Sequence, residues 1–349
     1  YEMDAAASTT AIGRKLLIYA KDIIENVYYD KKIQSKYGEI TSYAEYVYGD
    51  TDSVFFKFNF KDSHGNKIIG KKALELTIET AKEVGKIATN NLKYPHDLEY
   101  EKTFWPFCLL SKKRYLGHLF EEDIDNYKVK SMGIVLKRRD NAPIVKDIYG
   151  GIIDIIMKDR DIEKSIKFLE DMLNKLINKK IDIDKLTITK SLRGYYKFPE
   201  RIAHKVLADR IGLRDPGNKP RPGDRIPFVY ISSDKKKDLQ GNKIELPNYI
   251  KENNLNIDYG FYITNQIMKP ILQLYSLIIF DIKKYNCKSL KLKINTLKQN
   301  EEDKNKLIKK IQTIKEKEIE KLIFTNYTRI NNNNNKKNTM ITSFFSKRG

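Results

Sequence analysis

Cysteine is scarce in this chain, which has only Cys108 and Cys287 in its 349 residues. The two stand far apart and form no Cys-x-x-Cys spacing, so the sequence indicates neither a zinc site nor a disulfide framework and fits a reducing compartment. No apolar run approaches the roughly 18 residues of a membrane span, and no signal peptide is visible. We therefore expect a protein that is neither secreted nor embedded in a membrane.

Acidic residues are also in deficit. The chain has 66 Lys and Arg against 46 Asp and Glu, which gives a formal charge of +20. Such a charge favours a polyanionic partner, most economically nucleic acid. An ordinary lysine-rich protein from an A/T-rich genome is the alternative, because Lys, Asn and Ile are all abundant. The chain also lacks an initial Met, and from Tyr1 we expect a fragment or one piece of a split gene.

The first 140 residues combine helical and strand patterns. Periodic apolar residues predict helices over 8–28 and 70–92, and a hairpin lies between them. Alternating residues predict strands over 98–102 and 127–130. This order predicts an α+β fold with helices on one face of an antiparallel sheet. The expected buried and capping positions are Ile12, Leu16, Ile23 and Val27 with caps at Ser8, Thr9 and Thr10, and then Leu74, Ile78, Ala81 and Ile87.

Residues after about 140 are mainly helical by pattern. We predict helices near 143–158, 161–178, 199–211 and 259–284, with a Pro- and Gly-rich loop at 214–225 leading into a short strand at 226–231. A last helix is predicted over 299–324. The asparagine run at 331–335 predicts disorder.

Two carboxylates mark the predicted hairpin tip, Asp50 and Asp52 in Tyr-Gly-Asp-Thr-Asp-Ser. Residues two apart in such a setting project to the same side. Hard divalent cations prefer oxygen ligands of this kind together with substrate phosphates. An Asp-rich turn is more often only a solvated turn, so the neighbouring motifs must decide.

A basic motif follows about sixty residues later. Lys112, Lys113 and Arg114 precede Tyr115, and an apolar run stands before them. Three cations and an aromatic residue on a strand can hold the phosphates of a duplex. A solvated surface is the common alternative for such a tetrapeptide.

Several motifs in one order resemble family B (delta-like) DNA polymerases over about residues 5–285. The Asp-Thr-Asp hairpin, the Lys-Lys-Arg-Tyr motif and the Gly-Ile-x-x-x-Arg-Arg-Asp stretch at 133–140 carry the likeness. Segments at 195–197, 199–204, 223–227 and 259–267 are similar to the thumb of that family. The resemblance implies a C-terminal part of the palm at 1–140, a thumb at 141–298, and a basic tail at 299–349.

The resemblance also implies roles for single residues. Asp52 is expected to bind Mg²⁺ in a two-metal site and Asp50 to support it, for template-directed nucleotidyl transfer from deoxynucleoside triphosphates to a primer 3′ end. Contacts with the primer–template DNA are expected from Lys112, Lys113, Arg114, Tyr115, Arg138 and Arg139.

The end of the tail resembles a sliding-clamp-binding peptide. Asn338, Ile341, Phe344 and Phe345 occupy the positions of its usual Gln, aliphatic and two aromatic residues. Such aliphatic and aromatic side chains fill an apolar pocket on a partner. Asn338 is one methylene shorter than Gln, which weakens its contact.

Several parts of such a polymerase are missing from this sequence. It contains no Asp-x-x-Ser-Leu-Tyr-Pro-Ser motif, nucleotide-binding finger helix, proofreading domain or terminal cysteine clusters. We therefore expect the missing N-terminal half to be a partner and this chain to be inactive alone. The composition favours a large DNA virus, acting in the nucleus or at a cytoplasmic replication site. A non-catalytic duplex-binding and clamp-tethering module with a vestigial metal site is the alternative function.

Overall fold

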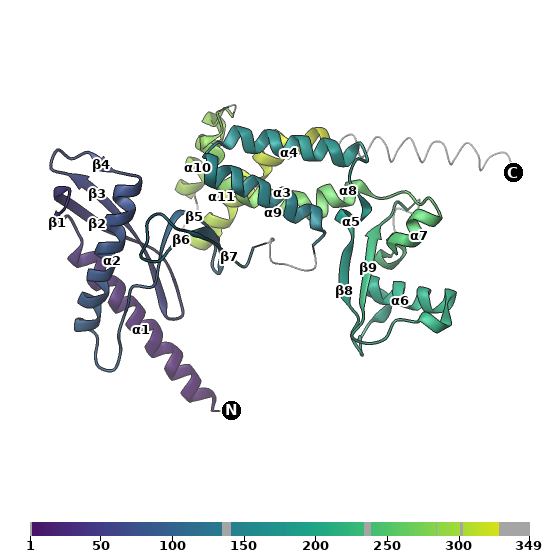
Figure 1. Ribbon diagram of the computed structural model, residues 1–349, viewed down its shortest axis with the longest axis horizontal. Coiled ribbons are helices and arrows are strands. Elements are labelled where there is room, and N and C mark those ends of the chain that lie inside the picture. Colours follow the sequence, from purple (N-terminus) through teal and green to yellow (C-terminus); the bar gives the residue numbers. More distant parts are fainter. Residues whose placement is uncertain (1, 135–140, 234–238, 284, 301–302, 328–349) are drawn as a thin grey trace. The chain divides into compact units, whose positions relative to one another are not determined.

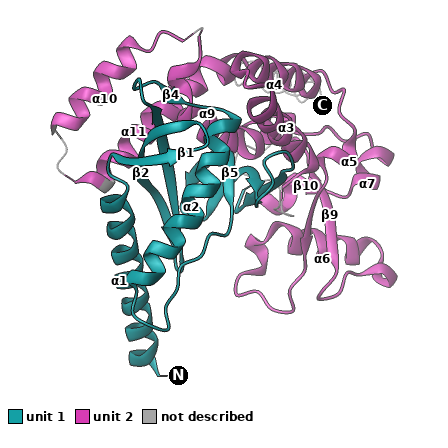
Figure 2. Cartoon of the chain, turned by 60° about the vertical axis from the view of Figure 1, so that its left-hand side comes forward, with its two compact units in different colours: residues 1–134 teal, residues 135–349 magenta. Residues whose placement is uncertain are grey.

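A computed structural model describes residues 2–134, 141–233, 239–283, 285–300 and 303–327 of the chain. It divides into two compact units, Tyr1–Ile134 and Val135–Gly349, coloured separately in Figure 2. Helices and antiparallel sheets occur in both units. The predicted α+β class is therefore confirmed. None of the described helices is long and apolar enough to span a membrane.

Unit 1 contains two antiparallel sheets and two long helices (Figure 1). The first sheet has the order β1-β2-β3-β4 and the second β5-β6-β7. Its elements are α1 (Met3–Val27), β1 (Lys31–Ser35), β2 (Gly38–Asp50), β3 (Ser53–Asp62), β4 (Lys67–Ile68), α2 (Lys71–Asn91), β5 (Thr103–Ser111), β6 (Arg114–Phe120) and β7 (Lys128–Met132).

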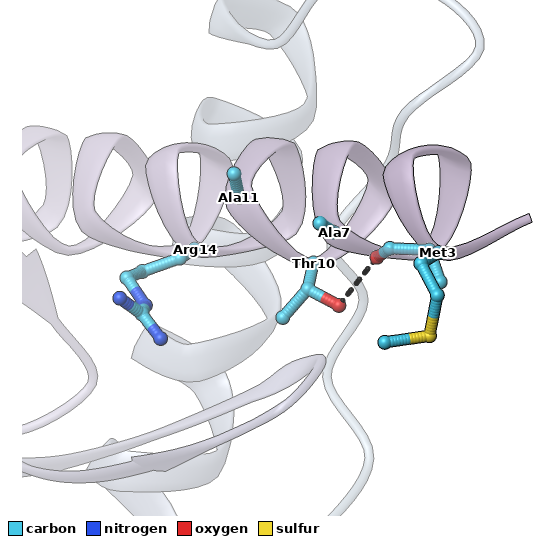
Figure 3. Close-up of a pocket in the computed structure, with 6 residues that line it drawn as sticks. Met3, Ala7, Thr10, Ala11 and Arg14 are labelled. Atoms are coloured by element: carbon cyan, nitrogen blue, oxygen red, sulfur yellow. Dashed lines mark hydrogen bonds between the residues drawn. The ribbon is translucent and has the colours of Figure 1, made fainter.

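Helix α1 begins at Met3, five residues before its predicted start. The expected capping residues Ser8, Thr9 and Thr10 lie inside the helix, so their predicted capping role is wrong. Thr10 Oγ1 donates to the Ala6 carbonyl oxygen at 2.8 Å beside a shallow hollow (Figure 3). The alanines of the first turns explain the early start, because Ala has the highest intrinsic helix propensity.

The buried face of α1 also differs from the predicted one. Ile12 is 55% exposed, whereas Ile24 is 1% exposed. Ile24 packs with Tyr28, with Ala44 of β2 and with Val84 of α2. Both helices therefore share one core against one face of the sheet, as expected. Leu74 and Ile78 of α2 are buried as predicted.

The predicted strand at 98–102 is absent, because β5 begins only at Thr103. The Leu98 backbone N–H donates to Thr89 Oγ1 at 2.9 Å, and the Leu98 carbonyl oxygen accepts from the same hydroxyl at 3.1 Å. A helix side chain thus satisfies the backbone that a neighbouring strand would otherwise pair. The second predicted strand corresponds to β7.

Unit 2 is mainly helical, with one three-stranded antiparallel sheet in the order β10-β9-β8. Its elements are α3 (Pro143–Asp154), α4 (Ile162–Ile177), α5 (Ile183–Leu186), β8 (Ile188–Ser191), α6 (Ala203–Arg214), β9 (Arg225–Tyr230), β10 (Ile244–Glu245), α7 (Pro247–Glu252), α8 (Tyr259–Phe261), α9 (Met268–Leu277), α10 (Lys288–Asn300) and α11 (Lys304–Ile319). The predicted helices near 143–158, 161–178 and 199–211 and the strand at 226–231 correspond to α3, α4, α6 and β9.

The predicted helix over 259–284 is interrupted. A π-helical segment, Tyr262–Ile267, separates α8 from α9, and Pro270 stands in the first turn of α9. Proline has no N–H to donate to the carbonyl of residue 266, which favours local widening of the helix. Beyond it, the predicted helix over 299–324 is α11 followed by a π-helical turn, and α10 was not predicted.

Candidate functional site

The carboxylates of the candidate site lie where β2 turns into β3. Asp50 is the last residue of β2 and pairs with Ser53. The Asp52 backbone N–H donates to the Asp50 carbonyl oxygen at 2.6 Å, and Ser53 Oγ donates to the same oxygen at 3.1 Å. Thr51 adopts φ of 56°, a left-handed conformation that closes the turn. The predicted hairpin is therefore confirmed.

The Lys-Lys-Arg-Tyr motif lies at a second hairpin, between β5 and β6. Lys112 and Lys113 form its turn, and only Arg114 and Tyr115 belong to a strand. The expectation of four residues along one strand is therefore wrong for the two lysines. The Arg114 and Ser111 backbones pair across the turn, and this tight closure presents both ammonium groups at the tip.

The structure brings these two tips together. Lys113 Nζ lies 2.9 Å from Asp50 Oδ1, and the Lys113 backbone N–H donates to Tyr48 Oη at 2.8 Å. Residues that stand far apart in the sequence thus meet through both a side chain and the backbone. Sequence reasoning did not predict this contact, and nothing in the local pattern signals it.

The ion pair shifts the pKa of both partners. The hydrogen bond from Lys113 lowers the pKa of Asp50 below its usual range, and the Asp50 carboxylate raises the pKa of Lys113. Both side chains are partly open to solvent, at 22% and 63% exposed. The carboxylate is therefore held ionised beside a cation that water and other anions can still reach.

Asp52 has a different environment. It is exposed, and its carboxylate accepts no hydrogen bond from the described residues. A free carboxylate on a rigid turn fits direct ligation of a hard cation. Within the described ranges, no group of three or more His, Cys, Asp or Glu side chains is arranged to hold a metal ion.

An aromatic cluster fixes the bases of both hairpins. The Phe55 ring lies 5.7 Å from Phe107 and 5.6 Å from Tyr115 between ring centroids, and Phe104 packs in the same group. Tyr115 is only 8% exposed, so its buried ring anchors the Lys-Lys-Arg-Tyr turn to this aromatic cluster. Ring pairs at these separations add to the stability gained from burial.

Gly133 allows the chain after β7 to lie close against the turn that contains Lys113. Gly133 adopts φ of +61°, and a Cβ at this position would lie 2.2 Å from the Lys113 carbonyl oxygen. Arg114 Nε donates to the Gly133 carbonyl oxygen at 3.3 Å. The Gly-Ile-x-x-x-Arg-Arg-Asp stretch therefore begins with a residue that supports the lysine turn.

A cavity of about 860 Å³ in unit 1 extends away from Asp52. Its lining is mostly apolar and includes Phe55, Phe58, Leu98 and Trp105. The lining belongs mostly to β3, α2, β5 and the segment that leads into β5. Sequence patterns did not indicate this cavity, because its walls come from elements that are distant along the chain.

A loop of unit 2 presents aromatic and basic side chains to solvent. Tyr195 is 81% and Phe198 47% exposed. The Phe198 ring carries Lys197 Nζ at 5.5 Å and the Arg201 guanidinium at 4.9 Å from its centroid. Exposed rings beside cations are typical of nucleic-acid surfaces. Tyr195, Lys197 and Arg201 lie in segments that the sequence identified as thumb-like, but the exposed Phe198 ring between the two cations was not predicted.

The remaining predicted site residues lie outside the described residues. These are the two arginines and the four residues of the clamp-binding-like peptide, namely Arg138, Arg139, Asn338, Ile341, Phe344 and Phe345. Their assignments stay predictions.

Comparison with known proteins decides the family. The model of DNA polymerase family B matches residues 1–278. The chain belongs to DNA polymerase family B. It is 50% identical over 351 residues to the DNA polymerase of Pyramimonas orientalis virus, across 99% of this chain. It is 33% identical to the DNA polymerase delta catalytic subunit of Caenorhabditis elegans, across 80% of this chain. The predicted family is therefore confirmed.

The fold agrees with that of a solved family B polymerase. The structure of the enzyme from Pyrobaculum calidifontis superposes with a TM-score of 0.51 at 18% identity, covering 82% of this chain and 31% of that one. The family B chain described here spans about a quarter of the relatives' length, 28% of the viral polymerase and 24% of the nematode subunit.

Proposed function

We propose that this chain forms the carboxylate-bearing part of the palm and the thumb of a DNA-directed DNA polymerase. The observation that carries the proposal is the 2.9 Å ion pair between Asp50 and Lys113. It joins an exposed carboxylate turn to a basic turn of the type that contacts duplex phosphates. The proposed reaction is nucleotidyl transfer from a deoxynucleoside triphosphate to a primer 3′ end at a site of viral or cellular DNA replication.

The proposed roles follow from the environments of the residues. Asp52, whose carboxylate is exposed, would bind Mg²⁺ directly, and Asp50 would hold Lys113 and set the local potential. Two bound Mg²⁺ ions would supply activation of the primer oxygen and stabilisation of the leaving pyrophosphate. A further carboxylate, from a part of the polymerase outside this sequence, would complete the site. Lys112 and Arg114 would contact backbone phosphates of the primer–template.

The proposed domains are a palm part at 1–140, a thumb at 141–298 and a tail at 299–349. The division between compact units, after Ile134, lies close to the first proposed boundary. In the thumb, the exposed Tyr195 and Phe198 and the adjoining cations would contact the duplex. The terminal peptide, with Asn338 and Phe345 at its two ends, is proposed to bind a sliding clamp.

A second candidate is a non-catalytic module that binds duplex DNA and tethers a clamp. The same ion pair favours it in one respect, because the Lys113 ammonium group balances the charge of Asp50. The exposed carboxylate of Asp52 favours catalysis, because a tether has no use for a second acid at a DNA-facing turn. Both candidates bind DNA, so only nucleotide incorporation separates them.

The test is primer extension in Mg²⁺ with this chain and a separately produced N-terminal half. We expect synthesis with the mixture, no synthesis with this chain alone, and a fall to background with Asp52→Ala. Asp97→Ala is the matched control, because Asp97 is also an exposed acid of unit 1. Equal activity of the two variants would exclude Asp52 as a metal ligand. Synthesis absent from the mixture, with salt-sensitive duplex binding retained, would favour the tethering module.

A further inference from the structure

Helices α10 and α11 lie outside the part of the chain that the family model matches, which ends at residue 278. The viral relative at 50% identity nevertheless aligns across 99% of the chain. The two helices are packed, with Leu290, Ile294 and Ile319 all at most 7% exposed. In Figure 2, α10 lies at the margin of unit 2. These two helices therefore form a packed extension, and the family match does not account for its function.

Two lysines from these helices converge on one aromatic ring. Lys291 Nζ of α10 lies 5.8 Å and Lys315 Nζ of α11 lies 5.0 Å from the centroid of Phe280. Phe280 itself is 39% exposed. Neither ammonium group forms an ion pair with a carboxylate of the described residues. We call Lys291 and Lys315, together with the Phe280 ring, the Phe280 lysine pair.

The acidic residues of α11 have other partners. The Glu318 carboxylate accepts a hydrogen bond from Tyr285 Oη at 3.4 Å and lies 3.6 Å from Lys293 and 3.3 Å from Lys321. Glu316 accepts from Gln312 Nε2 at 2.7 Å. The acids of α11 are thus directed elsewhere, and α10 contains lysines but no acidic residue.

Lys315 is half-buried, and burial lowers its pKa. A desolvated cation without a counter-ion is unfavourable. Anionic groups placed against the ammonium groups would supply the missing counter-charge. The partly exposed ring leaves the site open to an anion from solvent.

We propose that the Phe280 lysine pair contacts the phosphate backbone of duplex DNA and so extends the proposed duplex grip beyond the matched thumb. The choice of duplex DNA rests on the proposed function, and the site itself rests on the two lysines. Phosphodiester groups offer singly charged oxygens at regular spacing, which suits two separate ammonium groups better than one small anion does. The contact carries no sequence information.

The experiment measures binding of the full chain to a fluorescent primer–template duplex across a range of salt concentrations. The double variant Lys291→Gln with Lys315→Gln should lower the slope of log K against log salt by about 2, since each phosphate contact contributes about 0.9. At 0.15 M salt this corresponds to about 30-fold weaker binding. The double arginine variant should keep the slope.

The matched control removes the same charge from Lys32 and Lys71. Both are exposed and paired, with Glu39 and Asp125. The inference is overturned if the control lowers the slope as much as the Phe280 pair does. It is also overturned if the double Gln variant binds DNA normally but loses binding to inorganic phosphate or to phosphatidylserine vesicles.

This outcome is separable from that of the proposed function. Primer extension that depends on Asp52, together with an unchanged salt slope, would remove only the present inference. A slope that depends on the two lysines, without any extension by the reconstituted mixture, would leave a duplex-binding extension on a non-catalytic module.

Discussion

At the scale of single residues, the contact between Lys113 and Asp50 determines the character of the site. The ammonium group balances the Asp50 charge, while the Asp52 carboxylate stays exposed. Because Lys113 is 63% exposed, it can also reach a phosphate. One residue thus links the acidic turn to the basic turn that we propose to hold DNA.

This link predicts a change in titration. Lys113→Met removes the main cause of the lowered Asp50 pKa, so that pKa should rise toward the ordinary Asp value of about 3.9. Since the folded pKa lies below the unfolded one, the pair stabilises the fold above pH of about 4, and this contribution is lost as the pH falls through the folded pKa. Carboxyl NMR titration measures the change. Lys112→Met is the control, and an equal shift there would contradict the assignment.

Gly133 gives a second prediction at this scale. Gly133→Ala should destabilise unit 1 by about 2–3 kcal/mol, from the left-handed φ and from a Cβ driven into the Lys113 carbonyl oxygen. Urea unfolding followed by circular dichroism measures the loss. Gly65→Ala shares the positive φ, at +82°, but meets open space. It should cost only about 1 kcal/mol, and equal losses would show that the close approach has no energetic role.

At the scale of elements, the position of α1 corrects the sequence pattern. Residues spaced for one helical face were expected to be buried, yet the buried stripe runs through Ala20 and Ile24. The predicted stripe failed at the N-terminal end because α1 extends past the sheet there, which leaves Ile12 largely exposed (Figure 1). Nearer the sheet, the buried positions are shifted by one residue, to Ile24 and Tyr28 in place of Ile23 and Val27. Periodicity identifies a helix, but the length of the surface beneath it decides which turns are covered.

A pair of truncations tests the corrected face. Ile24→Ala should destabilise unit 1 by about 2–5 kcal/mol, because it opens a cavity among Tyr28, Ala44 and Val84. Ile12→Ala should change stability by no more than about 0.5 kcal/mol. Thermal and urea unfolding compare the two. A loss of similar size in both would place Ile12 in the core after all.

Helix α10 shows another limit of pattern reading. Its apolar residues Leu290, Leu292 and Ile294 alternate as in a strand, and lysines separate them. Leu290 and Ile294 are buried and Leu297 is half-buried, whereas Leu292 is 68% exposed, so the true face follows the i, i+4, i+7 spacing. A short helix with a narrow apolar face carries too weak a period to be distinguished from a strand by sequence alone.

At the scale of the whole molecule, the order of motifs predicted the family and the α+β class, because each motif is a local string. The hairpin with Asp50 and Asp52 was also predictable, since both its strands and its turn are contiguous. The contact of Lys113 with Asp50, the apolar cavity and the convergence on Phe280 were not predictable. Each joins residues that are distant along the chain, and tertiary packing alone brings them together.

Both turns of the candidate site are closed by a side-chain-bearing residue in a left-handed conformation, Thr51 at φ of 56° and Lys113 at φ of 60°. Glycine would relax each turn and would be expected to favour folding by up to about 1 kcal/mol. It would also remove the Thr51 hydroxyl, the Lys113 ammonium group and the stiffness that aims them. The two left-handed residues therefore lower the stability of the fold slightly, but they restrict the positions of the side chains at the tips of both turns.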